Sequence, residues 1–419
     1  MAGVETRGGT GPLVRRYQMG VDLDEIDLLS PELYAHGDPH SAWRTLRAHD
    51  PVHWHPERTG PGFWAVTRYH DVASISRDPK TFSSAGVRPN TPLADIGESM
   101  LIATDPPRHT KLRALVSKGF TPRMISRLET YVRQATRDVL DRAQPGVTYD
   151  FYTDLAAPVP LTVITELIGI PHEDQDYVGG LMNRFIDFAT DAMYDEGAGD
   201  FPTNAELWAY FQKLREQRQS DPSDDLITVL INAEVDGERL TDIELNAFLF
   251  ILVAAGIETT RSALSGAMLQ LGRHPEAWHR LRADPETLPT AVEEILRFVS
   301  PVTSFRRIAT HDTEIGGRKI AAGDRVALWY ASANRDADVF DDPDTFDITR
   351  TPNDHVAFGI GTHFCLGASL ARLELRVMLD EFLGRYDRPL EVVGLPVWKR
   401  SPSLWSIKSM PVRFQSGAA

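Results

Sequence analysis

The sequence predicts a mainly α-helical protein with a smaller β-rich part. Apolar residues recur at helical spacing over 122–143, 241–275 and 288–301, whereas strand-like patterns are confined to 62–69 and 313–332. The helix expected over 241–275 is apolar nearly all round its middle, which is typical of a helix at the centre of a fold. The expected architecture is therefore a set of helices packed around one long buried helix.

The ends of these elements can also be predicted. Thr241 followed three residues later by Glu244 makes a capping box, so the long helix should begin there. Pro301 should stop the helix over 288–301, because proline interrupts helical hydrogen bonding. In the β-rich part, the glycines of "TEIGGRKIAAGDRVALWYAS" (313–332) are expected to form turns between short strands.

The composition limits the organisation of the chain and its partners. The chain has 44 Lys and Arg against 59 Asp and Glu, a net charge of −15, which argues against a general nucleic-acid surface. No repeat or long linker is evident, so we expect a single domain over 21–419 after a flexible N-terminus over 1–20. The N-terminus lacks an apolar signal region, and the longest apolar run, 247–257, is too short to cross a bilayer. We therefore expect a cytoplasmic protein without a membrane anchor.

The only cysteine, Cys365, stands between a glycine-rich loop and a strongly helical segment. A single cysteine cannot form an intramolecular disulfide or a site built from several cysteines. It could be a small buried hydrophobe, a nucleophile with His363 as base, or an axial metal ligand. A helix N-terminus stabilises a thiolate, and Gly359 and Gly367 leave room for a flat ligand, so the third interpretation is favoured.

Two other segments have ordinary structural interpretations. Glu294 and Arg297 stand three residues apart on one helix face, where such a pair is most often solvated. In "DPPRHTKLRALV" (105–116), His109 and Arg113 stand four residues apart and could belong to an exposed charged helix. By itself, neither pair indicates a function.

The segment "AAGIETT" (254–260) could be a core helix that tolerates one glycine. However, Gly256 costs about 1 kcal/mol in a helix interior, and Glu258 and Thr259 place polar groups in an apolar run. A buried carboxylate requires a partner or a function. This segment is therefore a candidate functional element.

Together, these segments resemble the cytochrome P450 family. Phe358-Gly359-x-Gly361-x-His363-x-Cys365-x-Gly367 is similar to the family's haem-binding loop. Glu294-x-x-Arg297 is similar to its buried Glu-x-x-Arg element, and residues 254–260 are similar to its oxygen-activation segment. The resemblance covers about residues 35–415 and implies the cytochrome P450 fold, a triangular, helix-rich single domain with heme b (iron protoporphyrin IX) as cofactor.

The resemblance implies a role for each matching residue. Cys365 would be the axial iron ligand, with Phe358 shielding its sulfur. Gly359 and Gly367 would border the haem. The haem propionates would be bound by four donors, which are His109, Arg113, Arg307 and His363.

The same resemblance assigns the catalytic and structural residues. Thr259 would hydrogen-bond oxygen at the haem, Glu258 would help to pass protons from solvent, and Gly256 would leave room for dioxygen. A second arginine would complete the Glu294–Arg297 pair and support haem retention. Arg350 matches this arginine best, and Arg335 is the weaker candidate.

The function implied is a haem-thiolate monooxygenase that inserts one atom of O2 into a hydrophobic small molecule, by hydroxylation or epoxidation. A steroid, terpenoid, lipid or polyketide-like substrate fits this function. Electrons would come from a ferredoxin and an NAD(P)H-dependent ferredoxin reductase, since no flavin or nicotinamide fingerprint is evident. Four cations are expected to form a basic docking patch for an acidic ferredoxin: Arg108, Lys111, Arg372 and Arg376.

Three alternatives remain for this sequence. A peroxide-using relative tends to lack the acid–alcohol pair, and a haem-fold scaffold tends to lose the cysteine, whereas both features are kept here. A cysteine hydrolase with His363 as base is disfavoured, because residues i and i+2 of an extended loop seldom face each other.

The substrate pocket is expected to be apolar, with Trp405 near the end of its wall and with Arg88 and Arg184 as cations at its mouth. Its wall would come from five segments: 84–102, 181–194, 249–256, 300–305 and 401–407.

Overall fold

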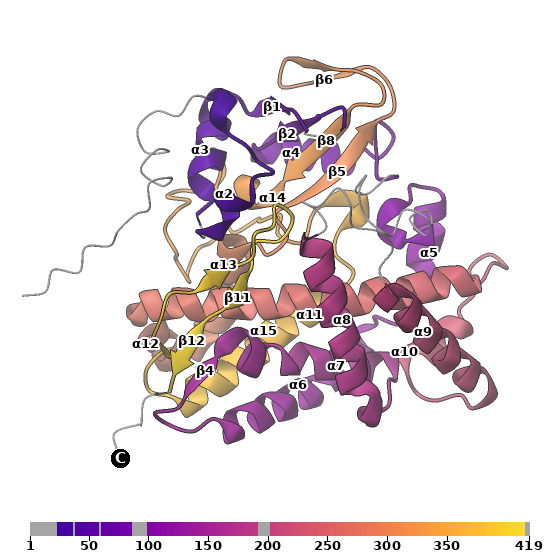
Figure 1. Ribbon diagram of the computed structural model, residues 1–419, viewed down its shortest axis with the longest axis vertical. Coiled ribbons are helices and arrows are strands. Elements are labelled where there is room, and N and C mark those ends of the chain that lie inside the picture. Colours follow the sequence, from indigo (N-terminus) through magenta and orange to yellow (C-terminus); the bar gives the residue numbers. More distant parts are fainter. Residues whose placement is uncertain (1–22, 37, 58–59, 86–98, 192–201, 415–419) are drawn as a thin grey trace, which may run out of the picture.

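The structure is a computed structural model that describes residues 23–36, 38–57, 60–85, 99–191 and 202–414. Helices make up most of it, and a β-rich part with α2 and α3 lies at one end (Figure 1). The predicted class, mainly α with a smaller β-rich part, is confirmed. The N-terminal segment over 1–20 lies outside the described residues, and the single-domain boundary remains a prediction.

The α-helices are α2 (Pro31–Ala35), α3 (His40–His49), α4 (Tyr69–Arg77), α5 (Arg108–Ser117), α6 (Pro122–Arg142), α7 (Pro158–Ile168), α8 (Gln175–Asp191), α9 (Pro202–Ser220), α10 (Leu226–Ile231), α11 (Asp242–Arg273), α12 (Pro275–Ala283), α13 (Leu288–Val299), α14 (Tyr330–Ala333) and α15 (Ala368–Arg385). Short 3-10 or π turns are η1 (Leu23–Glu25), η3 (Leu101–Ala103), η4 (Phe151–Ala156), η5 (His172–Asp174), η6 (Pro285–Thr287) and η7 (Gly361–His363).

The strands are β1 (Val52–His55), β2 (Phe63–Val66), β3 (Phe82–Ser83), β4 (Thr148–Asp150), β5 (Ser304–Ala309), β6 (Thr313–Ile315), β7 (Arg318–Ile320), β8 (Arg325–Trp329), β9 (Glu391–Val392), β10 (Val397–Trp398), β11 (Ile407–Ser409) and β12 (Pro411–Arg413). The largest sheet has five strands in the order β1-β2-β8-β5-β3. The β2–β8 pair is parallel, with Ala65 opposite Ala327, and the other pairs of this sheet are antiparallel. Smaller sheets are β4-β12-β9, β10-β11 and β6-β7.

The three long helices predicted from periodicity are confirmed as α6, α11 and α13. At the start of α11, the backbone N–H of Glu244 donates to the Thr241 hydroxyl at 3.2 Å, and the backbone N–H of Thr241 donates to the Glu244 carboxylate at 2.9 Å. The capping box therefore exists as expected. The α13 helix ends at Val299, and Ser300 caps it in the left-handed region at φ 42°.

The β-rich part differs from the prediction in detail. Residues 62–69 contain only the short strand β2, because α4 already begins at Tyr69. Residues 313–332 form β6, β7 and β8, and Gly316 and Gly317 make the β6–β7 turn at φ 54° and 80°. A side chain is disfavoured at such angles, so these glycines are required by the turn.

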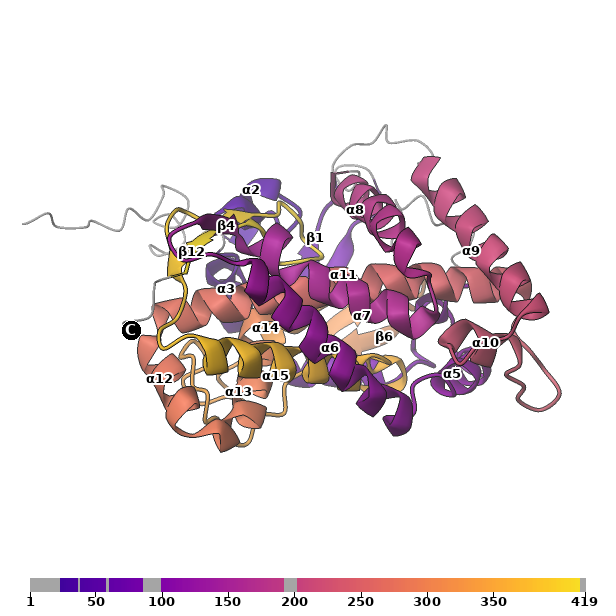
Figure 2. The ribbon, with the colours of Figure 1, turned by 90° about the horizontal axis from the view of Figure 1, so that it is seen from below.

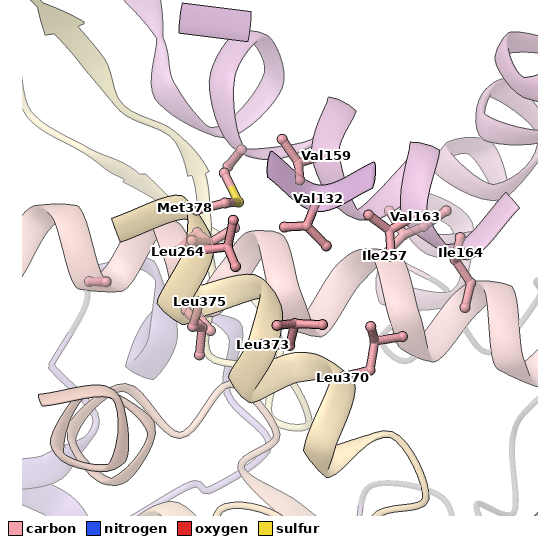
Figure 3. Packing of buried hydrophobic residues seen from close by; sticks show 14 of the residues in the cluster. Val132, Val159, Val163, Ile164, Ile257, Leu264, Leu370, Leu373, Leu375 and Met378 are labelled. Atoms are coloured by element: carbon pink, nitrogen blue, oxygen red, sulfur yellow. The ribbon is translucent and has the colours of Figure 1, made fainter. Parts of the chain in front are cut away.

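The central position predicted for α11 is confirmed. Figure 2 shows α6, α7 and α15 packed along it, and these helices share one large hydrophobic cluster with α11. Figure 3 shows Leu370 and Leu373 of α15 close to Val132 of α6 and Ile257 of α11. The first turns of α15 are thereby fixed near the middle of α11.

Two segments, 151–168 and 242–273, are long and apolar enough to cross a membrane by length and composition alone. Their most apolar stretches are 61% and 56% buried inside the protein. The longest apolar run of the sequence, 247–257, is thus part of a longer apolar helix. The packing of α7 and α11 in the hydrophobic core accounts for this composition.

Candidate active site

Cys365 lies in a closed loop that leads directly into α15. Its backbone N–H donates to the carbonyl oxygen of Phe358 at 2.9 Å, and Gly367 is the residue that caps α15. Gly359 has φ 67°, so its role in the loop is conformational. A Cβ added to Gly367 would lie 4.0 Å from the Cys365 sulfur, which is an ordinary contact. The loop therefore fixes the sulfur beside the helix N-terminus.

The environment of the thiol differs from the expectation of a stabilised thiolate. Burial raises the pKa of the Cys365 thiol, and the N–H of Gly367 and the charges of Arg113 and Arg372 lower it by less. The helix N-terminus therefore does not by itself favour the thiolate. A metal ion does deprotonate a coordinating thiol. A sulfur held in this position is suited to binding iron.

Four nitrogen-bearing side chains gather near this loop. The rings of His109 on α5 and His363 on η7 have centroids 4.2 Å apart. Arg113, one turn after His109, donates to the carbonyl oxygen of Phe364 at 2.7 Å. Burial and the charge of Arg113 lower the pKa of His109 to about 4. Burial, His109 and Arg307 lower the pKa of His363 to about 3.

The two histidines have buried nitrogens that nothing else satisfies. Among the described residues, both ring nitrogens of His109 and Nε2 of His363 have no hydrogen-bond partner. Such orphaned groups are costly unless a ligand pairs with them. The guanidinium of Arg307, on β5, also lies close enough to affect His363. Together these donors fit a ligand with negatively charged carboxylates, which is what the haem propionates supply.

The protein offers no conventional metal site in its described part. Within residues 23–414 as described, no group of three or more His, Cys, Asp or Glu side chains is arranged to hold a metal ion. A metal ligated by Cys365 would therefore need most of its ligands from a cofactor. The ring nitrogens of haem provide four such ligands.

The middle of α11 presents Thr259 on an accessible face of the helix. Ala255 is exposed and Thr259 is half-buried, whereas Ile257 and Glu258 between them are buried. The Thr259 hydroxyl donates to the carbonyl oxygen of Ala255 at 2.6 Å. This side-chain hydrogen bond is additional to the backbone hydrogen bonds of the helix. The hydroxyl can therefore rotate toward a molecule beside the helix without breaking them.

Gly256 faces α7 rather than the accessible face of α11. A Cβ at this position would lie 3.1 Å from the side chain of Ile164 on α7. Packing therefore explains why a glycine stands at this position, because the absence of a side chain lets α7 approach α11 closely. The predicted role of Gly256 in leaving room for dioxygen is not required by this packing and remains a prediction.

Glu258 is buried at 3% exposure and surrounded by polar partners. The Tyr152 hydroxyl donates to both carboxylate oxygens at 2.9 and 3.0 Å. The Arg261 Nε donates at 2.7 Å, and the Lys399 Nζ lies 2.9 Å from Oε1. Burial alone would raise the pKa of Glu258, but Arg261 and Lys399 lower it below its usual value. Glu258 is therefore a buried carboxylate held in its charged form.

Most partners of Glu258 could not be found from the sequence. Arg261 stands three residues later on the same helix, and this spacing is a detectable signal. Tyr152 and Lys399 come from η4 and from the chain just after β10, more than 100 positions away. No local pattern relates residues that distant.

Glu294, Arg297 and Arg350 are brought together as the resemblance implies. Arg297 forms two 2.8 Å hydrogen bonds with the Glu294 carboxylate, and both side chains are fully buried. Arg350 Nε lies 3.2 Å from the same carboxylate. Arg335, the weaker candidate, instead contacts Asp344 at 3.2 Å. Arg297 also donates to three backbone carbonyls, so it anchors the chain that leads toward the cysteine loop.

The predicted basic docking patch is partly neutralised in the structure. Arg108 and Lys111 pair with Glu238, and Arg108 also pairs with Glu244. The other two cations of the patch are also paired, Arg372 with Glu293 at 2.7 Å and Arg376 with Glu129 at 3.4 Å. The carboxylates come from segments remote in sequence, so counting only the cations overestimated the positive charge.

The expected pocket segments are only partly described. Arg88 and residues 86–98 and 192–194 lie outside the described residues. Arg184 is 57% exposed and lies 3.8 Å from Glu206, in keeping with a position at the surface. Ile251 and Leu252 on α11 are half-buried, as are Val302 and Leu404, which form a β-bridge.

Trp405 does not belong to this apolar wall, contrary to expectation. Its ring packs against His40 with centroids 4.8 Å apart and stacks on Trp398 at 5.2 Å. Alternation along the extended chain places it on the opposite side from Leu404.

One thiol beside a cluster of side chains that can bind carboxylates is an arrangement that fits haem.

A protein-family model described as Cytochrome P450 matches residues 204–392. The chain is 40% identical to a methyl-branched lipid omega-hydroxylase of Mycobacterium tuberculosis, with 94% of this chain and 95% of that relative covered. It is 37% identical to linalool 8-monooxygenase of Pseudomonas putida, with 87% and 93% covered.

Solved structures agree with these relatives. The structure of P450BioI in complex with hexadec-9Z-enoic acid ligated acyl carrier protein superposes with a TM-score of 0.85 at 32% identity, covering 92% of this chain and 99% of that chain. The chain belongs to the cytochrome P450 family. It is an oxidoreductase of the monooxygenase type, and heme b is its cofactor.

Proposed function

We propose that this protein hydroxylates or epoxidises a largely apolar small molecule of lipid or terpenoid character, with electrons from a ferredoxin and its NAD(P)H-dependent reductase. Bound haem supplies the chemistry, in which one atom of O2 enters the substrate and the other leaves as water. The observation that carries the proposal is the pair of histidines, with buried and unsatisfied ring nitrogens, beside the single cysteine.

In this proposal, Cys365 would hold the haem iron through its sulfur. His109, Arg113, Arg307 and His363 would bind the two propionates and so orient the cofactor. Phe358 would shield the sulfur, and its carbonyl oxygen accepts the hydrogen bond that closes the loop around Cys365. Glu294, Arg297 and Arg350 hold the loop that carries the cysteine. None of these side chains needs to change protonation during turnover.

Thr259 and Glu258 move protons in the proposed reaction. The Thr259 hydroxyl lies on the accessible face of α11 and can donate a hydrogen bond to oxygen near the haem. Glu258 sits one residue earlier, charged and buried, and can take up a proton and pass it toward Thr259. Proton supply from a positioned acid is a typical form of general acid catalysis.

The proposed substrate class rests on half-buried apolar side chains in the predicted pocket segments. Ile251, Leu252, Val302 and Leu404 are apolar and half-buried. Such surfaces gain about 25 cal/mol per Å² of apolar area removed from water. Relatives named for methyl-branched lipids and for linalool act on apolar molecules, which agrees with this class. The ferredoxin and a cytoplasmic location are part of the same proposal.

The test is turnover of the haem-loaded protein with a ferredoxin, its reductase and NADH under 18O2. A panel of branched fatty acids, terpenoid alcohols and steroids would first be screened for a substrate-induced change in the haem spectrum. We expect hits among these compounds and one 18O atom in each product. Spectral shifts only with small carboxylates or sugars would contradict the substrate class, and turnover only with hydrogen peroxide would contradict the electron source.

A further inference from the structure

A small cavity begins at Ser262, one helical turn after Glu258, on the side of α11 that packs against the C-terminal hairpin formed by β10 and β11. Its polar lining includes Ser262 and Gln270 of α11, and Trp405 lines it from the hairpin. The remaining lining is apolar and comes from α11, α13 and the hairpin. The cavity is therefore mostly apolar, with its polar groups gathered at a few points.

The cavity is suited to a water molecule. It has room for about one water, which needs two to four polar partners to be held in a protein interior. The indole Nε1 of Trp405 is buried and has no hydrogen-bond partner among the described residues. The Ser262 hydroxyl and the Gln270 amide lie in the same lining. These groups are the polar partners that the lining offers to a water, which would in turn satisfy the indole N–H.

Two serine hydroxyls connect this cavity with Glu258. The Ser262 Oγ lies 2.7 Å from the Ser406 Oγ and 3.3 Å from Glu258 Oε1. Ser406 Oγ lies 3.5 Å from the same carboxylate oxygen. Ser262, Ser406 and Glu258 are each at most 3% exposed, so bulk water does not reach them directly.

Both hydroxyls have more than one acceptor within reach. Ser262 can donate to the backbone carbonyl of Glu258 at 2.7 Å, and Ser406 can donate to the carbonyl of Ile407 at 3.1 Å. A hydroxyl with alternative acceptors can rotate between them, because it carries a single proton and two lone pairs. This freedom is what a proton relay requires and a purely structural hydrogen bond does not.

We propose that a water in this cavity supplies protons to Glu258 through the Ser262–Ser406 hydroxyl pair. Ser262 gives its proton to Glu258 Oε1 and takes one from the cavity water, either directly or through Ser406, which then takes one from the water, so each hydroxyl ends with one proton. The water regains its proton from solvent, and one proton in total reaches the carboxylate. This inference rests on the proposed function, in which Glu258 passes protons toward Thr259.

The relay is tested with Ser262→Ala, Ser406→Ala and the double variant. Ser265→Ala is the matched control, because the Ser265 hydroxyl is buried on the same helix and, within the part of the chain that the structure describes, bonds only to the carbonyl of Arg261. In the double variant we expect product formation per NADH to fall about fivefold, peroxide release to rise and the solvent deuterium isotope effect to increase. Haem content, the carbon monoxide spectrum and substrate affinity should match those of Ser265→Ala.

A measurement independent of turnover is a high-resolution crystal structure of the haem-loaded protein. We expect an ordered water within hydrogen-bond distance of Ser262 Oγ and Trp405 Nε1, which is lost in Trp405→Phe. A dry cavity would overturn the inference, as would a double variant that turns over like Ser265→Ala while Glu258→Gln is impaired. If Glu258→Gln itself is unimpaired, the proposed role of Glu258 fails and the relay fails with it.

Discussion

The ammonium group of Lys399 lies 2.9 Å from the Glu258 carboxylate, which joins the C-terminal hairpin to the middle of α11. Both side chains are buried to 4% exposure or less. Unpaired buried charges are costly, so each of these groups depends on its counter-charges to remain ionised. The charge state of Glu258 is thus set partly by the part of the chain that follows β10.

Replacing Lys399 with Met should destabilise the protein by about 1–3 kcal/mol at pH 7, since a buried carboxylate loses a charged partner. The pKa of Glu258 is lowered in the folded protein, so its stabilising effect is present above the unfolded value of about 4.3 and is lost as pH falls. The deficit of the variant should therefore shrink below about pH 4.3. Urea unfolding at several pH values measures this, with exposed Lys408→Met as control.

The same variant separates two explanations of how Lys399 stabilises the protein, by its charge or by its packing. A deficit that stays constant between pH 7 and pH 3.5 would mean that Lys399 stabilises the hairpin by packing rather than by its charge. A Lys399→Arg variant should recover most of the lost stability if charge is what matters.

Replacing Cys365 with His should abolish the thiolate-type carbon monoxide spectrum and oxygenase activity, because sulfur ligation to iron is lost. Leu366→Ala is a suitable control, since it alters the neighbouring side chain and leaves the sulfur in place. Retention of both properties in Cys365→His would refute the assignment of the ligand.

Replacing Thr259 with Ala should leave substrate affinity nearly unchanged but divert electrons to peroxide. The reason is that the hydroxyl on the accessible face of α11 would no longer direct protons. Product formed per NADH consumed should fall several-fold. Thr260→Ala, on a buried face of the same turn, is the control. An unchanged product ratio in Thr259→Ala would remove this residue from the mechanism.

Arg297→Ala should be the most damaging change in the arginine–glutamate cluster, at about 3–5 kcal/mol, because it leaves Glu294 buried with an incomplete set of partners. Arg350→Ala should cost less, since Arg350 lies at the edge of the cluster with 10% of its side chain exposed. The exposed Arg44–Asp344 pair is the control for the loss of a surface ion pair. Arg44→Ala should lower the free energy of unfolding by less than about 1 kcal/mol. Urea unfolding and the haem-to-protein ratio measure these effects. Equal losses for Arg44 and Arg297 would contradict the ranking.

Replacing Glu238 with Gln should strengthen docking of an acidic ferredoxin. The change removes the ion pairs of Glu238 with Lys111 and Arg108, which makes this face more positive. We expect the rate of electron transfer at limiting ferredoxin to rise about two- to fivefold at low salt and the gain to vanish at high salt. Exposed Glu276→Gln on α12 controls for a simple change in net charge. No difference between the two variants would place the docking surface elsewhere.

Much of the fold could be predicted from the sequence, because periodicity and capping act over short distances. The start of α11 follows from the Thr241–Glu244 capping box, and its central place follows from its apolar composition. The cysteine loop could also be recognised, since its glycines, histidine and cysteine are consecutive along the chain. The trio of Glu294, Arg297 and Arg350 required the resemblance, because Arg350 lies 56 positions from Glu294.

Contacts between distant segments were decided only by the tertiary structure. The basic patch inferred from Arg108, Lys111, Arg372 and Arg376 is partly neutralised because folding brings a carboxylate to each cation. Trp405 does not line the apolar wall because its ring packs against His40, which is far away in the sequence. Glu258 obtains Tyr152, Lys399 and Ser406 in the same way. The strength of a charge depends on neighbours within a few ångströms, and those neighbours are set by packing rather than by position along the chain.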